Sequence, residues 1–186
     1  MNQKMFVVCG PSGVGKGTII KNVIENTELN LALSKSITTR PPRLGDDLEG
    51  KYIFVSEEVF KIMVSSSDII EWNKYQGHCY GTSRAEIELI HTLGNHAIKD
   101  VDVNGHRNLR NKLDNILSIF IAAPISEIEK RLHIRGSNTL QEIKSRLMIA
   151  ESEMVCSSEF NFVVENREGR LDEAIKEVTR IIRVNT

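Results

Sequence analysis

The sequence predicts an α/β fold in which a parallel β-sheet core is flanked by helices. Apolar segments typical of strands alternate along the chain with segments whose apolar residues recur at helical spacing. The first strand is expected at Met5 to Cys9, an unbroken apolar run typical of a strand that is buried on both faces. With 186 residues, the chain has the usual size of a single domain.

Capping residues and apolar stripes mark the helices that follow. Residues 18–25 and 171–184 each place isoleucines and valines along one side of a helix. Ser56 is the expected N-cap of a helix over 56–64. Capping boxes are expected to begin three further helices, at Ser83 with Glu86, Ser126 with Glu129, and Thr139 with Glu142. Strand-like runs lie between the helices, at 97–103, 116–122 and 162–165.

The stretch from 34 to 82 departs from this alternation. It is rich in Ser, Thr, Arg and Gly and holds only short extended pieces, so we expect a small inserted subdomain. Basic and polar residues at 135–146 lie between two helices, and we expect them to form a helical lid. The core of this single domain is then expected to consist of residues 1–33, 83–134 and 147–186.

Composition excludes several classes of protein. The chain carries 24 basic and 25 acidic side chains, so it has no general basic field for binding a nucleic acid polymer. No apolar run approaches the roughly 20 residues that span a bilayer, and the first residues lead directly into a strand and a Gly-rich loop. The three cysteines are too widely spaced for a disulfide framework or a zinc site. We therefore expect a cytoplasmic protein with no membrane partner, either a monomer or a homodimer.

A phosphate-binding loop is predicted between the first strand and the first helix. Residues 10–16 fit the pattern G-x-x-x-x-G-K, in which glycines let successive backbone N–H groups face phosphate oxygens and Lys16 reaches the β and γ phosphates. Gly17 occupies the usual hydroxyl position, so Thr18 is expected to touch a phosphate or to hold Mg²⁺ through a water. The expected ATP-binding residues here are Gly10, Pro11, Ser12, Gly13, Val14, Gly15, Lys16, Gly17 and Thr18.

A second anion site is indicated further along the chain. Arg40 and Arg43 lie three apart on a segment stiffened by two prolines, so both guanidinium groups can face one phosphate. Taken alone, such a pair is equally typical of a solvated surface loop.

Together these motifs resemble the guanylate kinase family over nearly the whole chain. The matching stretches are 10–18, 36–43, 52–55, 70–72, 80–82, 100–102 and 131–146, in the family's order. The resemblance implies a P-loop kinase fold with a GMP-binding subdomain at 34–82 and a lid at 135–146. It also implies transfer of the γ-phosphoryl group of MgATP to GMP, and to dGMP, giving ADP and GDP in purine nucleotide metabolism.

The resemblance further implies a role for individual residues. The acceptor phosphate would be held by Arg40, Arg43, Tyr52 and Tyr80. The guanine would be read by Ser36, Glu71, Thr82 and Asp102. Asp100 would lie near Mg²⁺ and the phosphates, Arg131 and Asn166 near the adenine, and Arg135 and Arg146 on the ATP phosphates. The expected catalytic residues are then Lys16, Arg40, Arg43, Arg135 and Arg146.

The chemistry of guanine agrees with the assignment of Glu71. Guanine presents two donors side by side, N1–H and the N2 amine, and a carboxylate accepts both. Adenine has an acceptor at N1 and would face Glu71 with lone pair against lone pair, which disfavours its binding. Without the flanking motifs, Glu71 alone would be typical of a surface carboxylate at a strand end.

Two further features concern the strand expected at 97–103. Asp100 and Asp102 are two residues apart, so they are expected to point to the same face and to suit the waters of Mg²⁺. Lys99 stands in an otherwise apolar segment, where it is expected to snorkel outward or to pair with a carboxylate.

Two alternatives remain open at this stage. A P-loop kinase can act on another small phosphorylated acceptor such as a ribose bisphosphate, although a sugar phosphate offers no amine edge for Glu71 and Thr82. A guanylate-kinase-like module can also bind partners without catalysis, although such modules have lost the lysine that is present here as Lys16. In the enzyme, we expect positioning and charge neutralisation to drive the transfer, without a covalent intermediate or an important general base.

Overall fold

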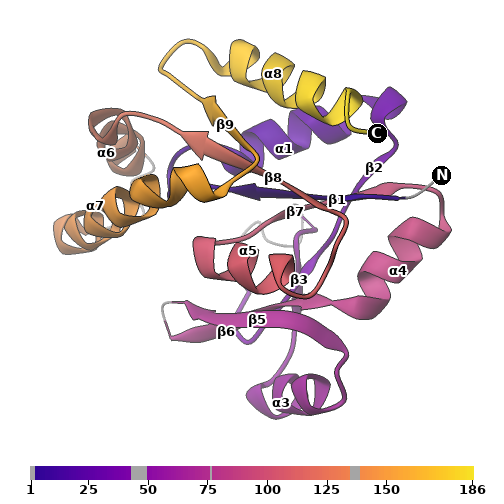
Figure 1. Cartoon of the computed structure of the whole chain (residues 1–186). Helices are drawn as coiled ribbons and strands as arrows, with labels where there is room; N and C mark the ends of the chain where they lie inside the picture. The colour runs from indigo at the N-terminus through magenta and orange to yellow at the C-terminus, as the bar shows by residue number, and fades with distance from the viewer. Residues whose placement is uncertain (1–2, 43–49, 76, 135–138) are drawn as a thin grey trace.

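A computed structural model describes residues 3–42, 50–75, 77–134 and 139–186, and in this part of the chain the strands form two sheets (Figure 1). The core sheet has five strands, and every neighbouring pair in it is parallel. In spatial order the strands are β2 (Leu31–Leu33), β7 (His96–Asp100), β1 (Met5–Cys9), β8 (Ile116–Ala122) and β9 (Phe162–Glu165). The predicted parallel α/β core is confirmed.

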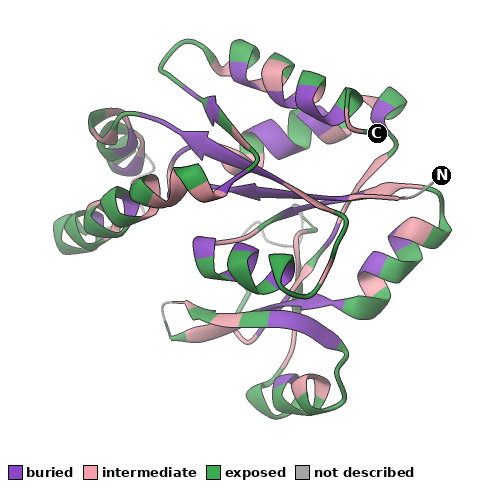
Figure 2. Ribbon diagram, viewed as in Figure 1, coloured by how far each residue is buried: buried purple, intermediate pink, exposed green. Residues whose placement is uncertain are grey.

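Helices cover both faces of the core sheet, which explains the unbroken apolar run of β1. Phe6 and Val8 pack into the cluster that includes α1 (Lys16–Ile24) and α8 (Leu171–Arg183). Met5 and Val7 point the other way, toward α4 (Arg84–Thr92) and α5 (Val103–Arg110). Figure 2 shows the resulting layers, with buried strands at the centre and exposed residues along the outer faces of the helices.

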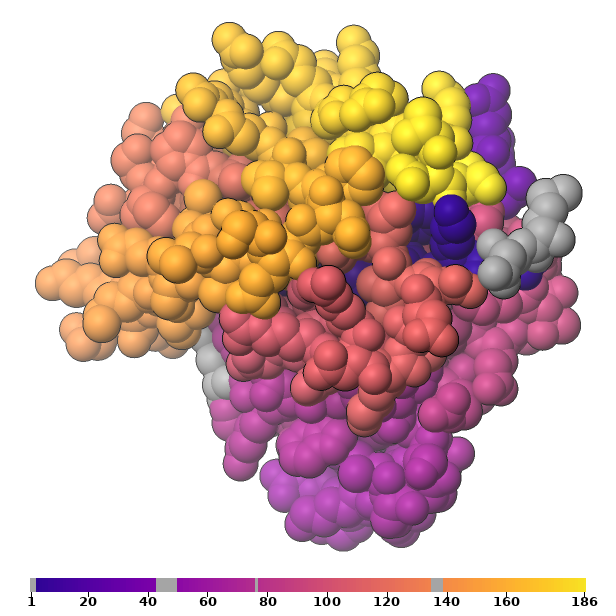
Figure 3. Space-filling view, viewed as in Figure 1, coloured from indigo at the N-terminus to yellow at the C-terminus, as the bar shows by residue number. Residues whose placement is uncertain are grey.

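The second sheet is smaller and mixed. Its spatial order is β4 (Tyr52–Phe54), β3 (Ser36–Thr38), β6 (His78–Ser83) and β5 (Ile69–Tyr75), with β3 parallel to β4 and antiparallel to β6. Helix α3 (Glu57–Ser65) covers it and buries Phe60 against Ile37 and Ile69. In the space-filling view this sheet and α3 form a lobe beneath the core (Figure 3).

Most of the predicted helix starts are confirmed. Ser56 and Ser83 accept hydrogen bonds from backbone N–H groups in the first turns of α3 and α4, and Thr139 forms a full capping box with Glu142 at the start of α7 (Leu140–Val155). At Ser83 only this half of the predicted box is seen, because the Glu86 carboxylate accepts from the N–H of Lys35. The box predicted at Ser126 is wrong, because α6 (Ile125–Ile134) begins two residues before the start that this box implies and leaves Ser126 inside its first turn. Short 3₁₀ segments complete the described elements, at Thr27–Leu29 and Cys156–Glu159.

The strand predicted over 97–103 is also wrong at its end. β7 stops at Asp100, and Asp102 is instead the N-cap of α5, where its Oδ1 accepts a hydrogen bond of 2.7 Å from the N–H of Gly105. Asp100 and Asp102 therefore do not share a strand face. None of the described helices combines the length and apolar character that crossing a membrane would require.

Candidate active site

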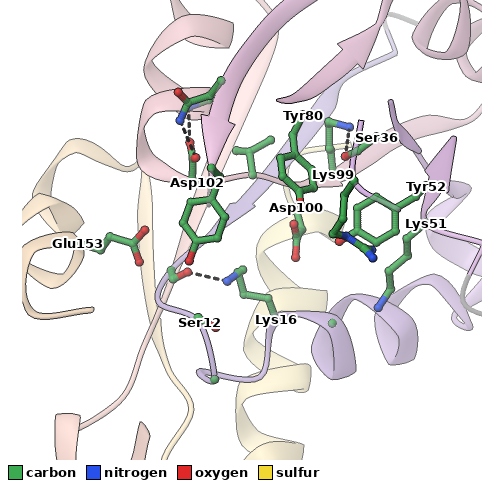
Figure 4. A pocket seen from close by; sticks show the side chains of 18 of the residues that line it. Ser12, Lys16, Ser36, Lys51, Tyr52, Tyr80, Lys99, Asp100, Asp102 and Glu153 are labelled. Carbon is green, nitrogen blue, oxygen red and sulfur yellow. Dashed lines mark hydrogen bonds between the residues drawn. The ribbon is translucent and has the colours of Figure 1, made fainter. Parts of the chain in front are cut away.

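A cavity of about 760 Å³ lies between the phosphate loop, the carboxyl ends of β1 and β7, and the second sheet. Its volume suits a small-molecule site, and the carboxyl ends of parallel strands are where α/β folds bind ligands. Figure 4 shows Ser12 and Lys16 on one side of this space, Tyr52 and Tyr80 on another, and Asp100 between them.

The phosphate loop takes a backbone path that only glycine allows at its ends. Gly10 has φ of 138° and Gly15 has φ of 102°, both in the region that disfavours L side chains. A Cβ at Gly10 would collide with the carbonyl oxygen of Ile121, and one at Gly15 with the amide of Asn166. The ammonium of Lys16 folds back over the loop, donating to the carbonyls of Gly10 at 2.6 Å and of Pro11 at 3.2 Å.

Two side chains brace this loop from outside the cavity. The carbonyl of Val14 accepts hydrogen bonds from Asn166 Nδ2 at 2.7 Å and from Arg131 Nη1 at 3.1 Å. Arg131 also donates to the Asn166 carbonyl at 2.7 Å and to Glu127 Oε2 at 3.1 Å. Arg131 and Asn166, predicted near the adenine, thus lie beside the loop, but neither lines the cavity.

Helix α7 contributes two charged residues to the cavity. Arg146 Nη1 donates to Ser12 Oγ at 3.1 Å, which brings this predicted residue onto the phosphate loop. Glu153 lies two turns further along the helix and was not predicted. Burial raises the pKa of its carboxyl to about 7, against the opposing attraction of Lys16. Its spacing of seven residues from Arg146, which puts both on one helical face, was the signal that could have found it.

The predicted acceptor-phosphate residues gather on the second sheet. Arg40 is only 6% exposed, and its guanidinium carbon lies 5.0 Å from the ring centre of Tyr52. Tyr52 and Tyr80 meet edge to face, with ring centres 6.3 Å apart. All three line the cavity, so one cation and two phenols from different strands face the same space.

A buried carboxylate stands at the edge of this acceptor region. Ser36 pairs with Thr82 across β3 and β6, and Thr82 pairs with Glu71 across β6 and β5. The Thr82 hydroxyl donates to Glu71 Oε1 at 2.6 Å, which fixes the orientation of the carboxylate. Burial raises the pKa of Glu71, while this hydrogen bond and nearby Lys99 oppose the rise. Ser36 and Glu71 line the cavity, but Thr82 is fully buried behind Glu71 and does not.

Asp102 lies in the cavity wall as the cap of α5. One carboxylate oxygen accepts from the N–H of Gly105 at 2.7 Å and the other from Asn73 Nδ2 at 2.8 Å. Gly105 packs closely here, because a Cβ on it would lie 3.2 Å from Val101 Cβ and 3.3 Å from Asp102 Oδ1. Asn73 was not predicted, although it lies two residues after Glu71 on the same strand.

The two residues predicted near a metal both line the cavity. Asp100 is exposed at the carboxyl end of β7, and Thr18 lies in the first turn of α1. Within the described residues, no group of three or more His, Cys, Asp or Glu side chains is suited to hold a metal by itself. This set fits Mg²⁺ bound chiefly through nucleotide phosphates, because Mg²⁺ keeps several waters and needs only one or two protein oxygens.

Lys99 contradicts the expectation that it would snorkel. Its side chain is 1% exposed, and its ammonium donates to Ser36 Oγ at 2.9 Å and to the carbonyls of Lys35 at 3.2 Å and Ser34 at 3.5 Å. Burial lowers its pKa to about 8, and the nearby carboxylates of Glu71 and Asp100 oppose that fall. The lysine therefore reaches inward, to the segment that links the two sheets.

Two predicted site residues, Arg43 and Arg135, lie outside the described residues. The other predicted residues gather around one cavity or directly behind its wall. Those that line it are Gly10, Ser12, Gly13, Gly15, Lys16, Gly17, Thr18, Ser36, Arg40, Tyr52, Glu71, Tyr80, Asp100, Asp102 and Arg146.

Comparisons with known proteins show which family the chain resembles along its length. A family model described as guanylate kinase matches residues 2–185. The chain is 36% identical over 182 residues to a guanylate kinase of Prochlorococcus marinus subsp. pastoris, covering 97% of each protein. It is 34% identical over 184 residues to one of Thermotoga maritima, covering 98% of this chain and 87% of that protein. The crystal structure of a guanylate kinase from Anaplasma phagocytophilum superposes with a TM-score of 0.78 at 26% identity, over 98% of this chain and 85% of the other.

Proposed function

Because the chain belongs to the guanylate kinase family, we propose that it transfers the γ-phosphoryl group of ATP to GMP, giving ADP and GDP. The observation that carries this proposal is the set of residues that line one cavity. A phosphate loop with its lysine forms one side, and a buried carboxylate suited to guanine stands on the other. We propose that dGMP is accepted as well.

On the donor side, we assign the ATP phosphates to the backbone of the phosphate loop and to Lys16. Phosphate oxygens would replace the carbonyls of Gly10 and Pro11 as partners of the ammonium, which lies beside the loop already. Arg146 is placed to neutralise charge on the transferring group, because it is bonded to Ser12 of the same loop. Arg131 and Asn166 act by holding Val14 and, with it, the loop in position.

On the acceptor side, we assign the GMP phosphate to Arg40, Tyr52 and Tyr80, with Arg43 as a further partner. Glu71 accepts the N1–H and N2 amine of guanine, which no other common base offers side by side. Thr82 holds the Glu71 carboxylate in orientation, and Ser36 and Asp102 complete the wall of the base site.

Mg²⁺ would be held by the ATP phosphates and, through water, by Thr18 and Asp100. When bound, the ion neutralises charge on the β and γ phosphates. The described side chains contribute the rest of the charge neutralisation through Lys16, Arg40 and Arg146.

The reaction needs no covalent intermediate on the protein. An oxygen of the GMP phosphate attacks the γ-phosphorus in line, a new P–O bond forms to give GDP, and the bond to the β-phosphate oxygen breaks to release ADP. Because this phosphate is already largely ionised at neutral pH, a general base is not required. The task of the protein is to align two anions that repel one another, and the arginines and Lys16 do this by charge.

We propose that the lobe formed by the second sheet and α3 moves toward the phosphate loop when both nucleotides bind, together with a lid over 135–146, of which 135–138 lie outside the described residues. Exclusion of water from the transferring group is the reason to expect closure. Solution scattering that showed no compaction with both nucleotides present would contradict this motion.

We further propose a cytoplasmic location, no partnership with nucleic acid polymers or membranes, and a monomeric or homodimeric state.

A panel of acceptors tests the proposed function. Turnover of GMP, dGMP, AMP, UMP and a ribose bisphosphate is measured with MgATP in a coupled assay for ADP. We expect GMP and dGMP to be used and the others to be poor acceptors. A higher rate with a non-guanine acceptor would favour a kinase of another small phosphorylated compound, and absence of all turnover would favour a non-catalytic binding module.

A further inference from the structure

Lys99 is the one fully buried cation on the wall of the cavity among the described residues, and the family assignment gives it no role. It comes from β7 of the core sheet, but all its hydrogen bonds cross to Ser34, Lys35 and Ser36, where the chain passes from the core into the second sheet. An ammonium has three N–H donors. With three acceptors already around it, Lys99 has no donor left for a ligand and must act through another residue.

The residue through which it acts is Ser36. A lysine ammonium only donates, so the Ser36 oxygen is the acceptor in the 2.9 Å bond between them. The hydroxyl proton must then point away from Lys99. Among the described residues no protein acceptor takes this proton, and Ser36 lines the cavity. The proton is therefore available to a ligand in the cavity.

The positive charge behind Ser36 also biases its hydroxyl toward donating. A hydroxyl that accepts from a cation is a stronger donor and a weaker acceptor, because hydrogen bonds in a chain polarise one another. The same charge attracts the partial negative charge of a carbonyl oxygen and repels the partial positive charge of an amine. Ser36 thereby matches a base with a carbonyl at C6, as in guanine, and opposes one with an amine at C6, as in adenine.

Resting on the proposed function, we propose that Lys99 is a positioning residue for base selection, which sets the Ser36 hydroxyl as the donor to the C6 carbonyl of GMP. The wall of the base site then carries a donor at Ser36 and an acceptor at Glu71. The Ser36 donor faces the C6 carbonyl of guanine, and the Glu71 acceptor faces its N1–H. A cation in an apolar strand, which the sequence leaves unexplained, is thus tied to the specificity of the acceptor site.

The test compares GMP with 6-thio-GMP, in which sulfur, a weaker acceptor, replaces only the C6 oxygen. Dissociation constants for both are measured by isothermal titration calorimetry, and KM values for GMP and ATP in the coupled assay. For Lys99→Met we expect affinity for GMP to fall about tenfold, as for loss of one hydrogen bond from a polarised group. The preference for GMP over 6-thio-GMP is expected to shrink, and the KM for ATP to stay unchanged. Lys74→Met, an exposed lysine on β5, is the matched control and should alter none of these values.

A double-mutant cycle separates positioning from a general structural role. If Lys99 acts through the hydroxyl, Lys99→Met has little further effect on GMP affinity in a Ser36→Ala background. An equal loss in both backgrounds, a parallel rise in the KM values for GMP and ATP, or no loss at all would overturn the proposal. If Lys99→Met does not fold, Ser36→Ala alone decides, because an unchanged preference for GMP over 6-thio-GMP in that variant contradicts the proposal. These binding ratios are measured without turnover. They can therefore contradict the role of Lys99 even when the wild type still phosphorylates GMP, which keeps this test separate from that of the proposed function.

Discussion

The phosphate loop and the proposed base-binding edge, formed by Ser36, Glu71 and Thr82, lie on opposite sides of one cavity, but the first is held by backbone and the second by side chains. The loop is one continuous stretch whose shape depends on Gly10 and Gly15 at positive φ and on two donors that share the Val14 carbonyl. The base-binding edge joins Ser36, Thr82 and Glu71, which come from three different strands.

The difference bears on how each side tolerates change. A backbone site loses little when one bracing side chain is removed, because the remaining contacts keep the loop in place. A side-chain site has no such redundancy, since Glu71 has one hydroxyl that orients it and is itself the group to which we assign recognition of the base. We therefore expect substrate specificity to be sensitive to single substitutions on the acceptor side, and nucleotide binding to tolerate them on the donor side, with one exception among the charged side chains there.

That exception is Lys16, and its removal should have the largest effect. In Lys16→Met we expect kcat to fall by about 10³-fold or more, because a charge that neutralises the transferring phosphoryl group is lost. GMP binding should change less than about twofold, because the acceptor side is built separately. Single-turnover kinetics and calorimetry measure the two quantities. Lys21→Met, an exposed lysine on the same helix, is the control. Equal losses in transfer and in GMP affinity would show that the two sides are not independent.

Glu71 tests the fragility of the acceptor side. Glu71→Gln keeps the shape of the side chain but turns one oxygen into an N–H donor, which opposes the donors of guanine. We expect kcat/KM for GMP to fall about 100-fold, while the KM for ATP stays unchanged. Steady-state kinetics with each substrate varied in turn checks this, with the exposed Glu88→Gln on α4 as control. A loss of less than about threefold would mean that Glu71 does not read the base.

The difference between a site on one continuous segment and a site assembled from separate strands also explains which half of the cavity could be predicted from the sequence. The phosphate loop is a continuous motif, and its flanking strand and helix follow from apolar pattern alone, so this half of the site was placed residue by residue. On the acceptor side the spacing of Arg40 and Arg43 indicated an anion site, but the base-reading residues were reached only through the resemblance. Ser36, Glu71 and Thr82 are brought together by a sheet whose strands have as few as three residues. Such strands are too short for a periodic pattern to define.

The errors have physical causes as well. The alternation Val101, Asp102, Val103 is typical of a strand, but the Asp102 side chain accepts from the N–H of the third residue of α5, Gly105, and caps a helix there. At Ser126 the helix begins earlier because the carbonyl of Pro124 accepts from Glu127 and Ile128. Lys99 was expected to reach water or to pair with a carboxylate, but its ammonium stays inside and donates to Lys35 and Ser36, which lie far earlier in the chain. Each of these depends on a partner that local sequence does not reveal.

Asn166 tests the robustness of the donor side. Asn166→Ala removes one of the two donors to Val14, and Arg131 retains the other. We expect the KM for ATP to rise only about fivefold with kcat nearly unchanged, consistent with loss of one buried hydrogen bond of about 1 kcal/mol. Asn161→Ala is the matched control, because its amide oxygen bonds Ser118 far from the loop and should affect stability alone. A loss as large as that in Lys16→Met would show that the loop has no redundancy.

The smallest expected effect concerns Glu153, the acidic group that faces the donor side. Its pKa of about 7 lies above the ordinary value because of burial, so the carboxyl is largely neutral at pH 6 and ionised at pH 8. An anion near Lys16 disfavours the ATP phosphates, so the KM for ATP should rise as pH rises through 7. Glu153→Gln should remove this rise and lower the KM by about threefold at pH 8, with no change at pH 6. The exposed Glu151→Gln on the same helix should keep the wild-type profile. Because Glu153 acts through charge on the backbone-held loop, it should leave the KM for GMP constant across this range. A parallel change for GMP would mean that its charge reaches both sides of the cavity.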